Sequence, residues 1–151
     1  IKEIKSFCKK HKNASYIPHF GSRNYLAVMK NVEVVIGNSS SGLIEAASLD
    51  KPVVNIGNRQ KNRLSATSVL DADYSITEII NSIKKALSND FKELAMKSIN
   101  PYDPYQDGKN SDRIVFALEN FFENYSPKEQ MVKKFDQKIS RWDVLLDGFE
   151  K

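Results

Sequence analysis

Three consecutive serines stand in a short polar segment, GNSSSG at residues 37–42, between an apolar run and a helix-forming run. Backbone N–H groups at the start of a helix lack partners within the helix, so they bind anions together with the positive end of the helix dipole. The hydroxyls of Ser39, Ser40 and Ser41 add donors, and the glycines let a ligand approach the backbone closely. The segment therefore predicts a phosphate-binding turn; in the alternative, the serines only cap the following helix.

Charged side chains that suit a phosphorylated ligand follow this segment. Glu45 lies one helical turn further on, where its carboxylate complements the helix dipole. Arg59 and Arg63 come after the next apolar run, where a guanidinium either pairs with phosphate oxygens or is an ordinary surface charge. The GK[ST] ending of a P-loop and the GxGxxG motif are both absent, so these residues predict a generic anion site.

Other chemistry has less support in the sequence. Ser39 is not expected to be a nucleophile, because no GxSxG motif or partner histidine accompanies it. His11 and His19 have neither a paired acid nor metal-ligand spacing, so we expect both to be non-catalytic. The sequence thus implies no metal site and no cofactor.

The elements that position these residues follow from apolar spacing. The expected helices cover residues 1–12, 42–49, 76–87, 90–98 and 128–150, with two more that begin at Ser22 and Ser111. The expected strands cover residues 16–19, 32–36, 52–56 and 68–72, and the near-continuous apolar run at 32–36 indicates burial on both faces. Ser22 is expected to cap its helix, and capping boxes are expected at 75–78 and 126–129.

Strands that alternate with helices predict an α/β fold with a parallel, Rossmann-like sheet and flanking helices. In such sheets, ligands bind beyond the carboxyl ends of the strands. The turn at 37–42 and the loop at 57–63 both leave carboxyl ends, so we expect them to face one crevice. Residues 99–110 are rich in turn formers, and we expect a connector there.

Composition limits the class of protein. The chain has 151 residues, 40% of them hydrophobic and 28% charged, which is typical of a globular domain. No apolar run approaches the roughly 20 residues that span a membrane, and the lone Cys8 fits a reducing compartment, so we expect a cytoplasmic location and no membrane partner. The basic cluster at 9–12 lacks interleaved aromatic residues, so no nucleic acid partner is expected. The first residue is Ile1, which favours a piece of a longer protein or a processed product.

A longer ordered pattern surrounds the serines. It consists of NSSSG at 38–42, Glu45-Ala46, Ser48-Leu49, KPVVNIG at 51–57, Arg59-Gln60 and Arg63. This pattern resembles the C-terminal domain of UDP-N-acetylglucosamine 2-epimerases, over residues 15–116. The resemblance is strongest to the hydrolysing branch that serves sialic acid and related nonulosonate synthesis, because the non-hydrolysing branch usually has DSGG followed by QEE here.

The resemblance implies a fold of two Rossmann-like domains of the glycosyltransferase-B type, with the nucleotide-sugar between them. Residues 1–125 would be part of the second, UDP-binding domain, and 126–151 a helical extension. Ser39 and Ser40 would contact the diphosphate, Ser41 and Gly42 would complete the turn, and Glu45 would bind the ribose. Tyr25 would lie beside the uracil, or in the core, and Arg59 would lie over the phosphates.

For the whole protein, the resemblance implies elimination of UDP from UDP-N-acetylglucosamine, then water addition to give N-acetylmannosamine. The family's HRxEN-like histidine stretch and first-domain acids have no counterpart here, so we expect no catalytic residue in this chain and an inactive isolated chain. A 2,4-diacetamido sugar is equally compatible. A glycosyltransferase domain of the same fold and a non-catalytic nucleotide-binding module are the alternatives.

The resemblance also bears on partners. The expected partners are a UDP-sugar and the missing N-terminal half of the same protein, with a homo-oligomer left open. In the sheet order 3-2-1-4-5-6, the strands at 32–36, 52–56 and 67–72 would be the fourth to sixth and that at 16–19 the third. The family's NPYGDG loop is here NPYDPYQDG at 100–108. The apolar stripe with Trp142 on the last helix would pack on another domain or on its own sheet.

Overall fold

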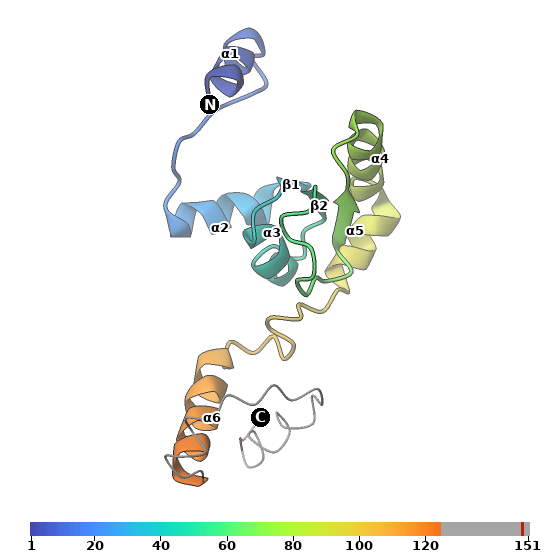
Figure 1. The fold of residues 1–151 in the computed structure, drawn as a ribbon. Coiled ribbons are helices and arrows are strands. Elements are labelled where there is room, and N and C mark those ends of the chain that lie inside the picture. The colour runs from blue at the N-terminus through green and yellow to red at the C-terminus, as the bar shows by residue number, and fades with distance from the viewer. Residues whose placement is uncertain (125–148, 150–151) are drawn as a thin grey trace. The chain divides into compact units, whose positions relative to one another are not determined.

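The computed structural model describes residues 1–124 and 149. The chain divides into two units, residues 1–102 and 103–151, which are described separately. The elements of the first unit are α1 (Lys2–Lys10), α2 (Ser22–Asn31), β1 (Val35–Gly37), α3 (Ser41–Ile44), the 3-10 helix η1 (Ala47–Leu49), β2 (Val53–Ile56), β3 (Val69–Ala72), α4 (Ile76–Ala86) and α5 (Asn89–Met96). Figure 1 labels these elements except η1 and β3. The second unit contains α6 (Asn110–Asn124).

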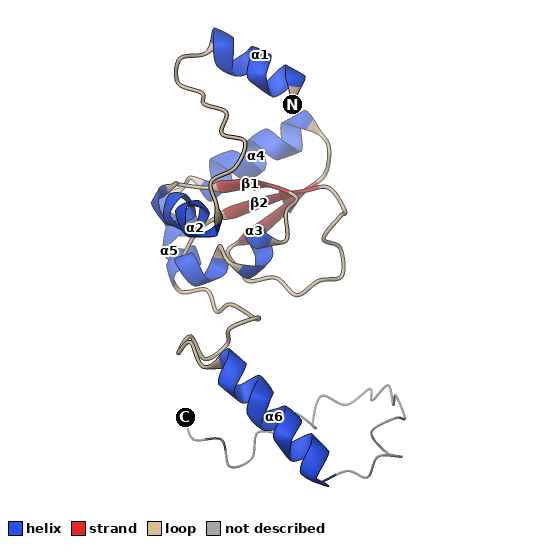
Figure 2. Ribbon diagram, turned by 90° about the vertical axis from the view of Figure 1, so that its left-hand side faces the viewer, coloured by secondary structure: helices blue, strands red, loops and turns tan. Residues whose placement is uncertain are grey.

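The first unit is built on a three-stranded parallel sheet in the order β1-β2-β3 (Figure 2). Val35 pairs with Val53 and Val53 with Val69, so the three strands begin in register. This arrangement confirms the predicted α/β, Rossmann-like fold class. It also confirms that the strands predicted at 52–56 and 68–72 lie side by side, with the carboxyl end of each strand at one edge.

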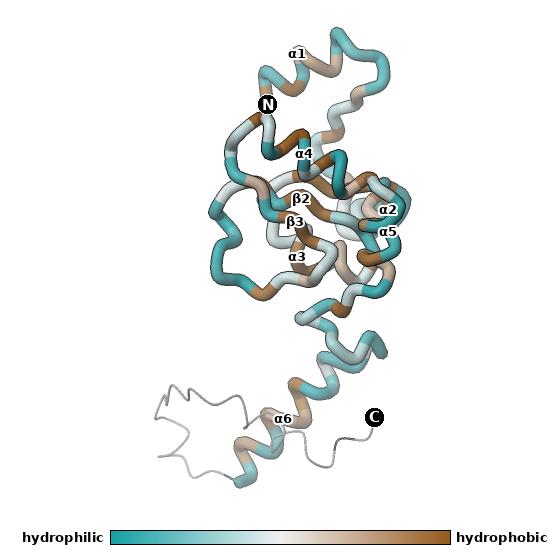
Figure 3. Tube along the Cα trace, turned by 90° about the vertical axis from the view of Figure 1, so that its right-hand side faces the viewer, coloured by the Kyte–Doolittle hydropathy of each residue, from teal (hydrophilic) through white to brown (hydrophobic). Residues whose placement is uncertain are grey.

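Both faces of the central strand are buried, because successive side chains of a strand point to opposite sides. Val54 packs with Ala72, Ala86 and Phe91, which brings α4 and α5 onto one face. Val53 packs with Met29 and Ala46, which brings α2 and the α3–η1 region onto the other face. The apolar colour gathers on β2 and β3 in Figure 3, as expected for strands at the centre of the core.

One strand prediction was wrong, and another was confirmed only in part. Residues 16–19 form no strand, and the segment between α1 and α2 is a loop. The run predicted at 32–36 pairs only from Val35 to Gly37, and Ile36 is 46% exposed, so this strand is not buried on both faces. Both differences have one reason: β1 is at the edge of the sheet, and no described segment pairs with its free side or covers Ile36.

The helix predictions at 1–12, 76–87 and 90–98 are confirmed within two residues or so of their ends. The helix predicted over 42–49 is instead two short pieces, α3 and η1, separated at Glu45 and Ala46. Gly21, not Ser22, occupies the N-cap of α2. Ser75 is at the N-cap of α4 but its side chain makes no capping hydrogen bond, so the predicted capping box is not formed there.

In the described part of the second unit, aromatic and charged side chains pack closely around Arg113. Arg113 on α6 is buried and donates to both carboxylate oxygens of Asp107, at 2.8 and 2.6 Å. Its guanidinium carbon lies 3.9 Å from the centre of the Tyr105 ring, and Phe149 packs edge-on against Phe116. The start of α6 confirms the helix predicted from Ser111.

Several predictions are left untested. The capping box at 126–129 and nearly all of the helix predicted over 128–150, with Trp142, lie outside the described residues. The division at 125/126 also stays a prediction. Within the described part of the chain, no helix combines the length and apolar character that crossing a membrane requires.

Candidate functional site

The predicted phosphate turn lies directly after β1, at residues 38–42, and is called the serine turn below. Leu43 N and Ile44 N both donate to the Ser40 carbonyl at 2.9 Å, and Gly42 N donates to the Ser39 carbonyl at 3.2 Å. Among residues 1–124 and 149, the backbone N–H groups of Ser39 and Ser40 have no protein acceptor, and the Ser40 hydroxyl has no partner. The Ser39 hydroxyl only accepts hydrogen bonds within the turn, so its O–H is also available, and the serine turn therefore offers four donors to a ligand.

The other two serine hydroxyls contact each other. Ser41 Oγ donates to Ser39 Oγ at 3.2 Å, and Ser41 N approaches the same oxygen at 3.4 Å. Ser40 is at the N-cap of α3 without a side-chain capping bond. Capping by the serines is thus limited to the weak bond from Ser41 N to Ser39, and it leaves Ser40 free.

Tyr25 reaches the serine turn from α2. Its hydroxyl lies 2.6 Å from Ser41 Oγ, and its side chain is 36% exposed, so it is a surface residue of the site and not a core residue. A small hollow of about 70 Å³ lies beside this contact, with Tyr25, Ser39, Ser41 and Asn55 in its wall. Tyr25 therefore fixes the Ser41 hydroxyl and exposes part of its ring next to the turn.

The loop after β2 crosses to the serine turn, as predicted. Arg59 Nη1 donates to the Asn38 carbonyl at 3.3 Å, and Gln60 Nε2 donates to the same oxygen at 2.7 Å. Gln60 is only 5% exposed, whereas Arg59 is exposed. Sequence reasoning assigned no role to Gln60; its position directly after Arg59 in the matched pattern was the only signal. The buried amide joins the two loops, and Arg59 keeps its charge at the surface beside them.

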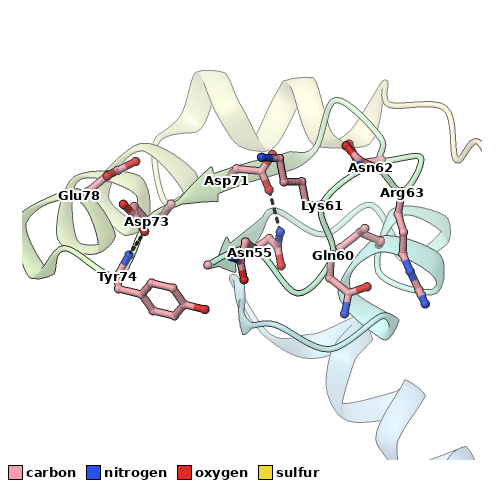
Figure 4. Close-up of a pocket in the computed structure, with 14 residues that line it drawn as sticks. Asn55, Gln60, Lys61, Asn62, Arg63, Asp71, Asp73, Tyr74 and Glu78 are labelled. Carbon is pink, nitrogen blue, oxygen red and sulfur yellow. Dashed lines mark hydrogen bonds between the residues drawn. The ribbon is translucent and has the colours of Figure 1, made fainter.

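A second, larger hollow of about 370 Å³ opens at the carboxyl ends of β2 and β3 (Figure 4). Its wall includes Asn55, Gln60, Arg63 and Asp71. Asn55 Nδ2 donates to Asp71 Oδ1 at 2.7 Å, and the side-chain oxygens Asn55 Oδ1 and Gln60 Oε1 have no partner within the described residues. Arg63 thus lines this hollow and makes no hydrogen bond to the serine turn. Asn55 is common to both hollows, which places them side by side.

Glu45 and Gly42 have different surroundings. Glu45 is exposed directly after α3, and its N–H donates to the Ser41 carbonyl at 3.0 Å. Gly42 is buried, and a Cβ added there would lie 3.1 Å from Val53 Cγ1. Gly42 therefore lets α3 pack closely on β2, while Glu45 leaves its carboxylate at the surface one turn beyond the serines.

Within residues 1–124 and 149, the histidine and acidic side chains form no metal-binding cluster that would be an alternative site. His19 Nδ1 accepts a hydrogen bond from Gly21 N at 2.7 Å, and His11 stacks on Phe7. In the part of the chain that the structure describes, no three His, Cys, Asp or Glu side chains gather as a metal site would require. The arrangement that remains is a set of neutral donors with one nearby cation, which suits a phosphate-bearing ligand.

Residues 1–119 match the model of a protein family described as UDP-N-acetylglucosamine 2-epimerase. The chain is 38% identical over 114 residues to polysialic acid biosynthesis protein P7 of Escherichia coli, a match that covers 76% of the chain and 29% of the relative. It is 34% identical over 118 residues to UDP-N,N'-diacetylbacillosamine 2-epimerase (hydrolyzing) of Legionella pneumophila, with coverage of 78% and 29%.

A third relative is GDP/UDP-N,N'-diacetylbacillosamine 2-epimerase (hydrolyzing) of Campylobacter jejuni. It is 35% identical over 91 residues, which are 60% of the chain and 23% of the relative. The chain therefore spans less than a third of the length of these relatives.

Proposed function

Since this chain belongs to the UDP-N-acetylglucosamine 2-epimerase family, we propose that its serine turn binds the diphosphate of UDP within a hydrolysing 2-epimerase. The observation that carries the proposal is the set of free donors on Ser39 and Ser40 at the carboxyl end of β1. Arg59 lies across the turn and supplies the positive charge. A doubly charged diphosphate suits this combination of hydrogen-bond donors and a cation.

The neighbouring residues complete the proposed UDP site. Tyr25 already holds the Ser41 hydroxyl, so Ser41 shapes the turn and its neighbours contact the ligand. The exposed part of the Tyr25 ring lies beside the uracil, and the Glu45 carboxylate accepts hydrogen bonds from the ribose hydroxyls. Gly42 keeps α3 against the sheet and gives the turn its shape.

The serine turn acts on the departing group in the proposed reaction. Elimination removes the C2 proton, whose bonding electrons form the C1=C2 double bond of a 2-acetamidoglucal, and breaks the C1–O bond, whose electrons leave with UDP. Charge grows on the diphosphate in that transition state, so preorganised donors and Arg59 lower the barrier. Helix α3 has only four residues, so its dipole contributes less than the dipole of the longer helix predicted from the sequence. The proton transfers and the later addition of water are assigned to the remainder of the protein.

Two sugars fit the proposal. UDP-N-acetylglucosamine is the substrate named in the family description, and two relatives are named for UDP-N,N'-diacetylbacillosamine. Both carry the same UDP, and the residues described here are proposed to bind that shared half.

Calorimetric titration of the full-length protein with UDP tests the proposal, together with a turnover assay on both nucleotide-sugars. We expect UDP binding and release of a 2-epimerised free sugar from one of them. Binding without turnover would indicate a non-catalytic nucleotide-binding module. Absence of UDP binding would rule out the proposed site.

A further inference from the structure

Asn100 is almost fully buried, at 1% exposure, and all of its side-chain hydrogen-bonding groups are used. Its Nδ2 donates to the Ile44 carbonyl and to Ser48 Oγ, both at 2.7 Å. Its Oδ1 accepts from Tyr102 N at 2.9 Å. One side chain therefore joins the segment after α5 to both α3 and η1, which lie more than 50 residues earlier in the chain.

The carbonyl that Asn100 binds belongs to the last residue of α3. The final carbonyls of a helix have no partner within it, and a buried carbonyl without a partner is costly. Within the described residues, no backbone N–H donates to the Ile44 oxygen, because the helical hydrogen bonding is interrupted between α3 and η1. The Asn100 amide supplies the missing donor and holds the two short pieces together.

A short path of hydrogen bonds leads from Asn100 to the serine turn. Asn100 binds the Ile44 carbonyl, and the N–H of Ile44 donates to the Ser40 carbonyl at 2.9 Å. Within residues 1–124 and 149, neither the N–H nor the hydroxyl of Ser40 has a partner. A helix of four residues has few internal hydrogen bonds of its own to fix its orientation, so an external contact at its far end has a large effect on its position.

We propose that Asn100 is a positioning residue for the serine turn: it holds the end of α3 so that the donors of Ser39 and Ser40 converge on the diphosphate. It does not touch the ligand. The inference rests on the proposed function, because it assumes that the serine turn binds the diphosphate. The inference adds to the proposed UDP site a residue from the 100–108 loop, to which the sequence pattern assigned no role.

Asn100→Asp in the full-length protein is the most direct test. The carboxylate keeps the acceptor for Tyr102 N but replaces the donor that faces the Ile44 carbonyl and Ser48. We expect the UDP affinity to fall about tenfold, which corresponds to the loss of one or two buried hydrogen bonds. Uridine lacks the diphosphate, so its affinity should fall by less than about threefold. Hydrogen–deuterium exchange of the backbone at 38–48 should become faster.

Ser98→Ala is the matched control. Ser98 is also buried, and its Oγ accepts from Thr67 Oγ1 at 2.9 Å and Ser68 N at 3.2 Å, so it joins the same segment to the start of β3 and not to α3. This variant should lower the melting temperature without a change in UDP affinity beyond about twofold. If both variants weaken UDP in proportion to their loss of stability, Asn100 has only a general structural role and the inference is overturned.

The outcomes separate the two proposals. Unchanged UDP affinity in folded Asn100→Asp, with weakened affinity in Ser40→Ala, overturns the inference and leaves the UDP site in place. A wild-type protein that does not bind UDP overturns both. If Asn100→Asp does not fold, Ser48→Ala is the substitute test, because it removes the Ser48 hydroxyl that accepts from Asn100 and leaves Asn100 itself unchanged. This variant should lower the UDP affinity two- to threefold and speed backbone hydrogen–deuterium exchange at 38–48. Unchanged values in that variant overturn the inference.

Discussion

Ser40 illustrates how one residue serves both the fold and the proposed ligand. Its carbonyl accepts the hydrogen bonds that start α3, while its N–H and hydroxyl remain free within the described residues. The Ser41 hydroxyl is not available to a ligand in the same way, because it is already hydrogen-bonded to Tyr25 and Ser39. The three serines are therefore not equivalent, although the sequence presents them as a uniform run.

The first prediction concerns the donors of the serine turn. Replacement of Ser39 and Ser40 by alanine should weaken UDP binding by about 1–3 kcal/mol, because the hydrogen bonds from their two hydroxyls to a charged group are lost while the backbone N–H donors remain. Calorimetry of the full-length variant measures this change. Ser6→Ala on α1 is an exposed serine replacement away from the turn and should leave the affinity unchanged. A double variant that folds normally and binds UDP as tightly as the wild type would contradict the assignment.

The second prediction concerns Glu45. Glu45→Gln should weaken UDP more than it weakens 2′,3′-dideoxy-UDP, because only UDP has the ribose hydroxyls that the carboxylate is proposed to bind. Titrations of both ligands into the wild type and the variant form a thermodynamic cycle, which isolates the free energy of the contact between Glu45 and the ribose hydroxyls. Equal losses for the two ligands would leave Glu45 as a residue that acts only through general electrostatics.

Residue types and spacing singled out the serine turn, Glu45 and Arg59 as candidates, because they lie within one short segment with a recognisable pattern, and the family resemblance added Tyr25. Gln60 and Asn100 were not assigned roles, although both bind backbone carbonyls in or next to the turn. Their contacts lie 22 and 56 residues away in the chain, and a single buried amide leaves no periodic pattern in a sequence. Such contacts become visible only when the fold brings the two segments together.

At the scale of elements, the sequence predicted what local periodicity determines. Helices α4 and α5 and strands β2 and β3 lie where the apolar spacing placed them. The strand predicted at 16–19 did not form, because a strand requires a pairing partner and local propensity cannot supply one. The helix over 42–49 was predicted whole, but its register breaks at Glu45 and Ala46, where the buried Ala46 packs against Val53 of the sheet. Tertiary packing there overrides local propensity.

The third prediction concerns the start of α6. Arg113 donates two hydrogen bonds to the Asp107 carboxylate and Lys109 N donates another, so the pKa of Asp107 lies far below its ordinary value. A lowered pKa in the folded state stabilises the protein above the unfolded pKa of about 4, and this stabilisation is lost as the pH falls towards the folded pKa. Asp107→Asn should therefore reduce the free energy of unfolding at pH 7, and the difference from wild type should shrink between pH 4 and pH 2.

Denaturant unfolding at several pH values measures this difference. Glu119→Gln replaces an exposed carboxylate on the same helix and is the control for a general effect of charge. A difference between wild type and Asp107→Asn that stays constant from pH 7 to pH 2 would show that the Asp107–Arg113 pair does not stabilise the fold through its charge.

At the scale of the whole molecule, the described residues are proposed to form only the UDP-binding half of the site. The match covers 29% of the polysialic acid biosynthesis protein and 29% of the Legionella 2-epimerase. The edge strand β1 also leaves Ile36 46% exposed. Large apolar side chains are also exposed on α1 and α6, among them Ile4, Phe7, Ile114 and Phe122. We propose that the remainder of the full-length protein covers part of this apolar surface and supplies the acid–base groups.

The last prediction follows from that division. Neither His11 nor His19 has a carboxylate partner within residues 1–124 and 149, so no acid–base pair built on histidine is present there. Purified residues 1–151 should therefore show no release of free sugar from UDP-N-acetylglucosamine or UDP-N,N'-diacetylbacillosamine, while the full-length protein turns over one of them. Titration of the same sample with UDP shows whether its half of the site is intact. Turnover by residues 1–151 at the rate of the full-length protein would place the chemistry within this chain and refute its assignment to the remainder.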